Sequence, residues 1–316
     1  MNITGIETLV FGAADLADSR QYLIDYGLEP CATDPLRLEA LDGSAVILRD
    51  ALDEELPPAL AVTCQLRKTV MGVASADDLE AIAAELAKDR DVKRLADGSI
   101  ESVDDTGYVI GFQLSSRKPI NGLGELSNAP GSPIQRAANQ LGVHAGRGRI
   151  QPRSLSHIVY FVHDVAKAEA FYVQRLGMRC TDRFDGVGPF LQPAGSLDHH
   201  THFLIGVPPF VPLGVEHFTF HFAGPTEVLQ NGYRFVDPGY QAFWGPGRHI
   251  FGSNWFWYFN SPLGCHVEMD ADMDLHDATW VPRTAALASD NSQAFLLRFR
   301  KQWMPGTTTP HEGDYV

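Results

Sequence analysis

The segment 244–272, WGPGRHIFGSNWFWYFNSPLGCHVEMDAD, contains the residue types with the clearest potential for chemistry. A Ser-Pro-Leu-Gly sequence around Pro262 separates two runs of aromatic and β-branched residues, which predicts a β-hairpin. Pairing about Pro262 places Tyr258 opposite His266 and diagonal to Glu268, because side chains alternate between the two faces of a strand. One face of the hairpin is therefore expected to carry a phenol beside a carboxylate.

Two histidines and one carboxylate are candidate metal ligands. His157 in LSHIVYFV, His217 in VEHFTFHF and Glu268 in CHVEMDAD each lie in a predicted strand. Together they are the donor set of a facial triad, in which a non-haem Fe(II) keeps open positions for substrate and O₂. Mn(II) accepts the same donors. The sequence therefore predicts a divalent metal site, with Fe(II) as the first choice of ion.

These side chains need a scaffold, and an internal repeat predicts one. Residues 5–28 and 155–178 align without a gap at an offset of 150. Each segment predicts a short strand, a turn and a helix that ends at a glycine. Asp15 and Asp164 are the predicted N-caps of the two helices.

A second repeat follows the first in each half of the chain. Residues 68–73 predict a strand, and Ser75 begins a predicted helix with the spacing of a capping box. Residues 215–222 predict the corresponding strand of the second half, followed by a helix near 225–229 and by the hairpin. We therefore expect an α+β fold of four βαβββ modules in two domains.

The module boundaries predict a division of the chain into four parts. These are a non-catalytic N-terminal domain of two modules at 1–116, a Gly/Pro/Asn-rich linker at 117–150, a catalytic metal-binding domain of two modules at 151–272, and a C-terminal tail at 273–316.

Two local expectations concern the second half. Residues 184–192 predict one strand of the third module. In the tail, the Ser-Asp-Asn sequence from Ser289 predicts the cap of a short helix that carries Phe295, Leu296 and Trp303.

The first half serves as an internal control for the metal site. At the offset of 150 it has Glu7 in place of His157. Alignment of the turns at Gly107 and Gly264 puts Gly111 in place of Glu268, and residues 68–73 contain no histidine. A repeat that needed these ligands only for folding would keep some of them. The chemistry is therefore expected in the second half alone.

Composition narrows the class of protein. The formal net charge of −14 disfavours nucleic acid and anionic membranes as partners, since both require basic patches. The sequence has neither a signal-peptide pattern at MNITGIETLV nor an apolar run of membrane-spanning length, so we expect no membrane association and a cytoplasmic location. The four cysteines lie far apart without a CxxC, so we expect neither disulfides nor a zinc knuckle.

The motif GPGRH…GSN.F.YF..P.G…E, together with the four modules and the His/His/Glu set, resembles the type I extradiol ring-cleaving dioxygenases of the vicinal oxygen chelate superfamily. The resemblance covers nearly the whole chain, and it is strong in residues 155–272 and weak before them. It implies the glyoxalase, bleomycin-resistance and dioxygenase fold. It also implies an oxidoreductase that cleaves a catechol with Fe(II) and O₂ in the degradation of aromatic compounds, and that forms a homo-oligomer.

The resemblance also assigns residue roles. The family's metal ligands fall on His157, His217 and Glu268, its acid–base histidine on His200, and its active-site tyrosine on Tyr258. The family's histidine before the hairpin falls on His249, which the flexible Gly-Pro-Gly sequence lets reach the rim of the hairpin face.

The substrate side of the site and the other histidines are predicted in less detail. Strand alternation lets only one of His199 and His200 face the metal, and His200 fits the family pattern better. We expect substrate contacts from Trp244, Phe190 and Asn254, and an aromatic wall suits a catechol with an apolar or aryl substituent. A structural role is expected for four other histidines: His163, His202, His221 and His266.

Two alternatives keep the fold and change the function. One is an oxygen-independent isomerase or lyase that uses a divalent metal as a Lewis acid. The other is a non-catalytic ligand-binding member of the same superfamily, for which an intact His/His/Glu set is unnecessary.

Overall fold

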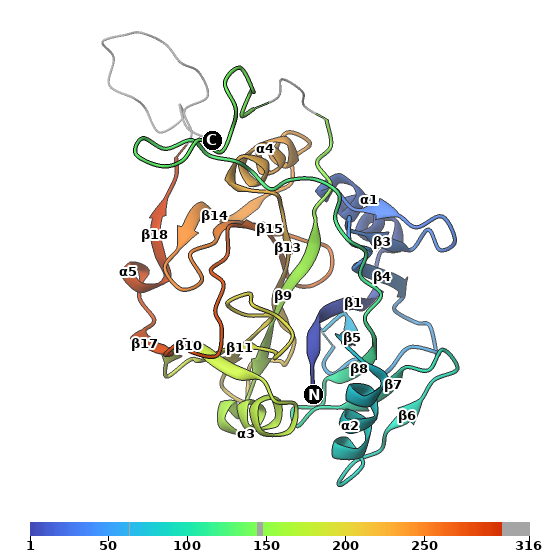
Figure 1. Ribbon diagram of the computed structural model, residues 1–316. Coiled ribbons are helices and arrows are strands. Elements are labelled where there is room, and N and C mark those ends of the chain that lie inside the picture. Colours follow the sequence, from blue (N-terminus) through green and yellow to red (C-terminus); the bar gives the residue numbers. More distant parts are fainter. Residues whose placement is uncertain (63, 144–147, 299–316) are drawn as a thin grey trace.

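The computed structural model describes residues 1–62, 64–143 and 148–298 (Figure 1). The first half contains two modules of the same design. The first consists of β1 (Ile3–Ala13), α1 (Leu16–Tyr26), β2 (Glu29–Pro30), β3 (Arg37–Glu39) and β4 (Ala45–Asp50). The second consists of β5 (Leu66–Val73), α2 (Ala76–Leu86), β6 (Lys93–Arg94), β7 (Ile100–Val103) and β8 (Val109–Leu114).

The second half repeats the design. The third module consists of β9 (Ser154–Val162), α3 (Val165–Ala170), the π-helical turn η1 (Phe171–Arg175), β10 (Arg179–Asp185), β11 (Gly188–Gln192) and β12 (His202–Gly206). The fourth consists of β13 (Val215–His221), α4 (Pro225–Val236), β14 (Ala242–His249), β15 (Trp255–Asn260) and β16 (His266–Ala271). The chain then adds β17 (Arg283–Ala286), α5 (Ser289–Ser292) and β18 (Gln293–Leu296).

The two modules of each half form one sheet, and β17 and β18 extend the second sheet at its two edges. The first sheet has the order β2-β3-β4-β1-β5-β8-β7-β6, and the second has β17-β10-β11-β12-β9-β13-β16-β15-β14-β18. In both sheets the first strands of the two modules, β1 with β5 and β9 with β13, pair antiparallel at the centre. The predicted α+β fold of four βαβββ modules is confirmed. The predicted domain boundaries stay a prediction.

The second sheet curls strongly, as the chain length between its edges requires. Ten strands spaced about 4.8 Å apart would make a flat sheet about 43 Å wide. The edge strands β17 and β18 are joined only by the chain from Ala286 to Gln293, which spans at most about 25 Å. Both edges are therefore brought close to each other, and the red segment from β17 through α5 to β18 runs along one side of the molecule in Figure 1.

The helices begin where the sequence predicts them. The side chains of Asp15 and Asp164 accept hydrogen bonds from the backbone N–H groups of Asp18 and Lys167, and Ser75 caps α2 in the same way. The helix of the third module has one more residue between its cap and its terminal glycine than α1 has, and the π-helical turn η1 accommodates this residue.

This extra residue corrects the alignment of the two halves. In the sheets, the antiparallel pairs Thr8 with Val70 and His157 with Thr219 occupy the same place, so the offset in the strands is 149. The counterpart of His157 is therefore Thr8, and the predicted counterpart Glu7 was wrong by one residue.

Two further local predictions were wrong. The single strand predicted for 184–192 is the end of β10 and all of β11, separated by a turn in which Gly186 has φ +70°. In the tail, α5 has only four residues, and Phe295 and Leu296 lie on β18, which pairs with β14. Trp303 lies outside the described residues.

One hydrophobic cluster extends through both halves. Phe11 of β1 lies 5.4 Å from Phe218 of β13 between ring centroids, and both side chains are fully buried. The hydroxyl of Tyr26 on α1 donates to the backbone carbonyl of Glu268 at 2.6 Å. The first half therefore supports the backbone of a predicted metal ligand. In residues 1–62, 64–143 and 148–298, none of the helices combines the length and the hydropathy that a membrane span requires.

Candidate metal centre

Three adjacent strands position the predicted metal ligands. His157 lies on β9, His217 on β13 and Glu268 on β16, and β13 is the middle strand of the three. Thr219 of β13 pairs with His157 on one side and with Glu268 on the other. Because side chains two residues apart share a face of a strand, His217 lies on the same face as Thr219. The register therefore brings the three ligands together.

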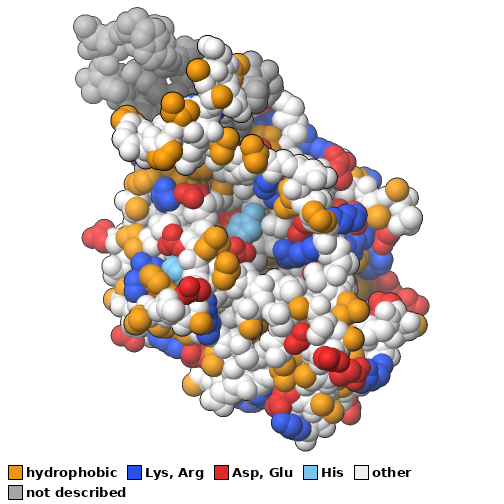
Figure 2. Space-filling model, viewed as in Figure 1, with side chains coloured by type: hydrophobic (Ala, Val, Ile, Leu, Met, Phe, Trp, Pro, Cys, Tyr) orange, Lys and Arg blue, Asp and Glu red, His pale blue; other side chains and the backbone are white. Residues whose placement is uncertain are grey.

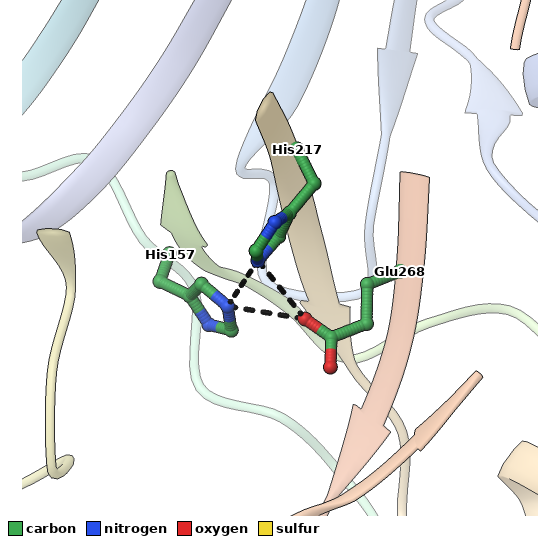
Figure 3. Close-up of side chains that lie close together, drawn as sticks. All are labelled: His157, His217 and Glu268. Carbon is green, nitrogen blue, oxygen red and sulfur yellow. Dashed lines mark hydrogen bonds and ion pairs between the residues drawn. The ribbon is translucent and has the colours of Figure 1, made fainter. Parts of the chain in front are cut away.

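Their ligand atoms form a closed triangle. His157 Nε2 lies 3.2 Å from His217 Nε2 and 3.1 Å from Glu268 Oε2, and the third side measures 3.4 Å. Figure 3 shows the three side chains converging from their strands. Two donor atoms about 2.1 Å from one ion, at angles of about 90° to 109°, lie about 3.0 to 3.4 Å apart. The triangle therefore has the size that a divalent ion requires.

The chemistry of the donors also fits a cation. Glu268 is fully buried, and its Oε1 has no hydrogen-bond partner among the described residues. Burial alone would raise the pKa of this carboxyl, but the neighbouring His157 and His249 hold it well below the ordinary value. A buried carboxylate with an unpaired oxygen beside two imidazole nitrogens is stabilised by a bound metal ion.

The two histidines are oriented by their other ring nitrogens. His157 Nδ1 lies 2.9 Å from the hydroxyl of Ser156, and His217 Nδ1 contacts the carboxylate of Glu216. Such partners fix the ring orientation and direct Nε2 towards the metal. Burial lowers the pKa of His157, whereas the Glu216 carboxylate outweighs burial and raises the pKa of His217.

The hairpin places Tyr258 beside Glu268, although its register differs from the predicted one. Tyr258 pairs directly with Glu268, because the turn is centred on Leu263 and stabilised by the hydroxyl of Ser261, which donates to the carbonyl of Cys265. The predicted pair Tyr258 with His266 was therefore wrong by two residues. An even shift keeps every side chain on its face, so the phenol still lies beside the carboxylate.

His249 lies on the other side of Tyr258. Its Nε2 is 3.3 Å from the Tyr258 hydroxyl and 3.6 Å from Glu268 Oε1. Its Nδ1 lies 3.0 Å from the carbonyl of Ser292, in the C-terminal segment. Burial, followed by the charge of Glu268, raises the pKa of Tyr258 well above its ordinary value, so this phenol stays protonated.

Of the two adjacent histidines, His200 lines the cavity and His199 lies behind it. The His200 ring lies 4.2 Å from the His157 ring between centroids. His199 is fully buried, and its Nδ1 lies 2.9 Å from His200 Nδ1. The structure thus brings all six predicted ligand and catalytic side chains to one place, while their roles stay predictions.

A cavity of about 470 Å³ opens onto these side chains, and neither lysine nor arginine is among the described residues that line it. Trp244, Phe190 and Asn254 line it, so the three side chains predicted to contact substrate all reach it. Much of its wall belongs to a small apolar cluster of its own, separate from the main core, formed by Val159, Phe184, Phe190, Phe203 and Phe251. Figure 2 shows histidine side chains inside a hollow near the centre of the face drawn.

The histidines predicted to be structural have other partners. His221 Nδ1 lies 2.7 Å from Asp270, and His266 Nδ1 lies 2.9 Å from Glu216. His163 contacts the carbonyl of Val211, and His202 contacts the hydroxyl of Thr201.

Two residues that line the cavity, Glu216 and Leu287, were not predicted from the sequence. Glu216 faces the cavity together with its neighbour His217, because a register shift between Val215 and His217 breaks the alternation of faces. Leu287 reaches the cavity from the C-terminal segment. The sequence gives no signal for a β-bulge at Glu216. Leu287 was missed because a helix was predicted in the tail, whereas the segment pairs with the sheet as strands.

Comparison with known proteins agrees with this architecture. Residues 154–269 match the model of the Glyoxalase/Bleomycin resistance protein/Dioxygenase superfamily. Metapyrocatechase 2 of Cupriavidus necator is 36% identical over 160 residues, which are 51% of this chain and 46% of that protein. The match therefore spans less than half the length of this curated relative.

Solved structures share the whole fold at low sequence identity. The Mn(II)-bound glyoxalase from Novosphingobium aromaticivorans has a TM-score of 0.71 at 20% identity, over 98% of this chain and 95% of that chain. The 2,3-dioxygenase LapB from Pseudomonas sp. KL28 has a TM-score of 0.67 at 16% identity, over 90% of this chain and 98% of that chain. The chain therefore has the vicinal oxygen chelate fold, and its segment 154–269 carries the sequence pattern of the Glyoxalase/Bleomycin resistance protein/Dioxygenase superfamily.

Proposed function

We propose that this protein is an Fe(II)-dependent extradiol dioxygenase, which cleaves the ring of a catechol beside its two hydroxyl groups. Both atoms of O₂ enter the product, a muconic semialdehyde or its keto equivalent. The observation that carries the proposal is the triad of His157, His217 and Glu268 at the cavity, with His200 and Tyr258 beside it. The similarity to Metapyrocatechase 2, 36% identity over 160 residues, supports it.

The three ligands would hold the iron. An Fe(II) at this position supplies coordination sites for the substrate and O₂ and lowers the pKa of a catechol hydroxyl. Mn(II) accepts the same donors, so the choice of iron rests on the proposed reaction.

The side chains around the triad have separate tasks. Tyr258, whose pKa is raised well above the ordinary value, keeps its proton and donates a hydrogen bond to a deprotonated catechol oxygen. His249, 3.3 Å from that hydroxyl, holds the phenol and contacts the substrate from the rim. His200 exchanges a proton with the reacting oxygen through Nε2, since its Nδ1 is directed at His199. The apolar wall excludes water from the ring.

The cavity favours a catechol with an apolar substituent. The aromatic wall includes Phe190, Phe203 and Phe251, and neither lysine nor arginine is among the described lining residues that could pair with a substrate carboxylate. The carboxylate of Glu216 would repel such a group. We expect the specificity constant for 2,3-dihydroxybiphenyl to exceed that for a carboxylated catechol by about tenfold or more. A tenfold ratio corresponds to a difference of about 1.4 kcal/mol in binding free energy between the two substrates. Preference for the carboxylated compound would contradict this assignment.

A second candidate function is an oxygen-independent isomerase or lyase, favoured by the high structural similarity to the Mn(II)-bound glyoxalase. The discriminating experiment is oxygen uptake by anaerobically purified, Fe(II)-loaded protein on a panel of catechols, with Glu268→Ala as the control. We expect uptake and a yellow product from the wild type and neither from the variant. Metal binding without uptake on any catechol would favour the glyoxalase-like function. The predicted homo-oligomer and cytoplasmic location stay predictions.

A further inference from the structure

A chain of four polar side chains leads from the C-terminal segment to His200. Arg283 of β17 contacts the carboxylate of Asp182 through Nη2 at 2.5 Å and through Nε at 3.1 Å. Asp182 Oδ2 lies 2.8 Å from His199 Nε2, and His199 Nδ1 lies 2.9 Å from His200 Nδ1. Asp182 and His199 are fully buried. Every link lies within hydrogen-bond distance.

The fold builds this chain from three separate segments. Asp182 lies on β10 and pairs in register with Arg283 of the parallel neighbour β17. The backbone N–H of Arg283 also donates to Asp182 Oδ1 at 2.7 Å. The histidines precede β12. A residue 101 positions away in the sequence thus holds the carboxylate behind the cavity.

The surroundings keep Asp182 ionised. Burial would raise its pKa, but the hydrogen bonds from His199 and Arg283 outweigh burial and lower it. An ionised carboxylate only accepts hydrogen bonds. The proton in the bond between Asp182 and His199 therefore lies on His199 Nε2.

This assignment fixes both imidazole tautomers. Arg283 pairs with the charge of Asp182. A neutral His199 with its proton on Nε2 has an acceptor at Nδ1. The short contact between the two Nδ1 atoms then requires that His200 Nδ1 donates. A neutral His200 with its proton on Nδ1 has a lone pair on Nε2, the nitrogen free to act in the cavity.

We infer that Asp182, held by Arg283 and acting through His199, is a positioning residue that fixes the ring orientation and the tautomer of His200. Only the role of His200 in proton exchange rests on the proposed function. The tautomer itself follows from the hydrogen bonds, and it is measurable without turnover.

The first test is nitrogen NMR of the metal-free protein and of the Zn(II)-loaded protein with ¹⁵N-labelled histidine, which distinguishes the two neutral tautomers. We expect His199 with its proton on Nε2 and His200 with its proton on Nδ1. Asp182→Asn, which removes the charge and offers a donor to His199, is expected to abolish this single arrangement. Arg283→Lys keeps both the carboxylate facing His199 and a cation beside it, and is expected to keep this arrangement. His200 with its proton on Nε2 in the wild type would overturn the inference.

A second pair of variants tests the same link by turnover and stays informative if Asp182→Asn fails to fold. In His199→Gln the amide can donate to Asp182 and accept from His200, whereas His199→Leu can do neither. We expect His199→Leu to lower kcat about 10- to 100-fold with KM and metal content unchanged, and His199→Gln to restore most of kcat. Equal loss in both variants would contradict the inference.

The two proposals fail in distinguishable ways. If no catechol supports oxygen uptake while the tautomers are as expected, the proposed function fails and the positioning of His200 stands. If ring cleavage occurs and the tautomers of Asp182→Asn equal those of the wild type, the proposed function stands and the inference fails.

Discussion

The pairing of β1 with β5 in the N-terminal sheet has a β-bulge at Glu7, which has no partner in the register. The pairing of β9 with β13 in the C-terminal sheet has the same β-bulge at Ser156. The C-terminal sheet has a further β-bulge at Glu216 on β13. Its counterpart in the N-terminal sheet is the β-bulge at Arg67 on β5. The two sheets therefore share their β-bulges as well as their strand order. A residue of one half can be assigned to its counterpart in the other by register.

The register gives the first half different residues at all three ligand positions. Thr8 stands for His157, Lys68 for His217 and Gly111 for Glu268. Lys68 is engaged in an ion pair with Glu101 at 2.9 Å. The fold thus forms equally well around an ammonium group, a hydroxyl and a glycine. The comparison teaches that the scaffold does not require the His/His/Glu set, which supports a chemical role for it.

The largest expected effect is the loss of the metal ligands. Glu268→Ala or His217→Ala is expected to abolish stoichiometric metal binding and to reduce kcat/KM by about 10³-fold or more, because several kcal/mol of transition-state stabilisation depend on the metal. Metal analysis and steady-state kinetics measure both effects. Full activity in either variant would place the chemistry elsewhere.

A second effect concerns stability, since the second half buries the ion pair of His221 with Asp270, whose counterparts in the first half are uncharged. His221 lies between Asp270 and Asp198, and by register the counterparts of His221 and Asp270 are Gly72 and Gln113. His221→Gln leaves Asp270 without its cation and is expected to lower the free energy of unfolding by about 3 kcal/mol. Urea titrations of variant and wild type provide the measurement.

The same pair predicts a pH dependence. Burial lowers the pKa of His221, but Asp270 and Asp198 outweigh it and raise the pKa well above 6.5 in the folded protein. A group with a raised folded pKa contributes stability that is fully present below its unfolded pKa and is lost as the pH rises through the folded pKa. The stability difference between wild type and His221→Gln should therefore shrink with rising pH from about 6.5. A difference that grows with pH would refute the assignment.

A third, smaller effect should follow from Glu216, which contacts Nδ1 of the ligand His217. Its counterpart in the first half is Arg67, so the carboxylate is specific to the second half. Glu216→Gln keeps the shape and removes the charge, and it is expected to weaken metal binding about 10- to 100-fold. Competition with a chromophoric chelator measures this affinity. An unchanged affinity would show that Glu216 serves the cavity wall only.

The smallest expected effect is in the first half. Lys68→Met removes the counterpart of His217 and should leave kcat/KM and metal content within about twofold of the wild type, with at most about 1 kcal/mol lost with its ion pair. This variant is the matched control for His217→Ala. A large loss of activity in Lys68→Met would break the comparison between the halves.

The sequence predicted the modules and the triad because both leave local signals. The caps Asp15, Ser75 and Asp164 mark helix starts, and the alternation around Glu268 marks one face of a strand. Local errors had local causes. The hairpin register was wrong because the five-residue turn is centred on Leu263, and such a turn differs little in composition from a shorter one.

The residues that surround the triad, such as Glu216 and Asp182, could not be predicted from the sequence. The offset of the repeat was wrong because the π-helical turn at Phe171–Arg175 accommodates an extra residue that no local signal reveals. Glu216 faces the cavity through a β-bulge, and Asp182 meets Arg283 only after the last strands have paired. Contacts between distant segments depend on the completed sheet, so a single sequence does not predict them.

The most direct test of the central claim is ring cleavage under ¹⁸O₂. The Fe(II)-loaded protein would convert a catechol with an apolar substituent, such as 2,3-dihydroxybiphenyl, and mass spectrometry would count the labelled oxygen atoms in the product. We predict a ring-opened product with two ¹⁸O atoms from the wild type and none from Glu268→Ala. A product without label, or the same labelled product from Glu268→Ala, would contradict the account of His157, His217 and Glu268 as the centre of an extradiol dioxygenase.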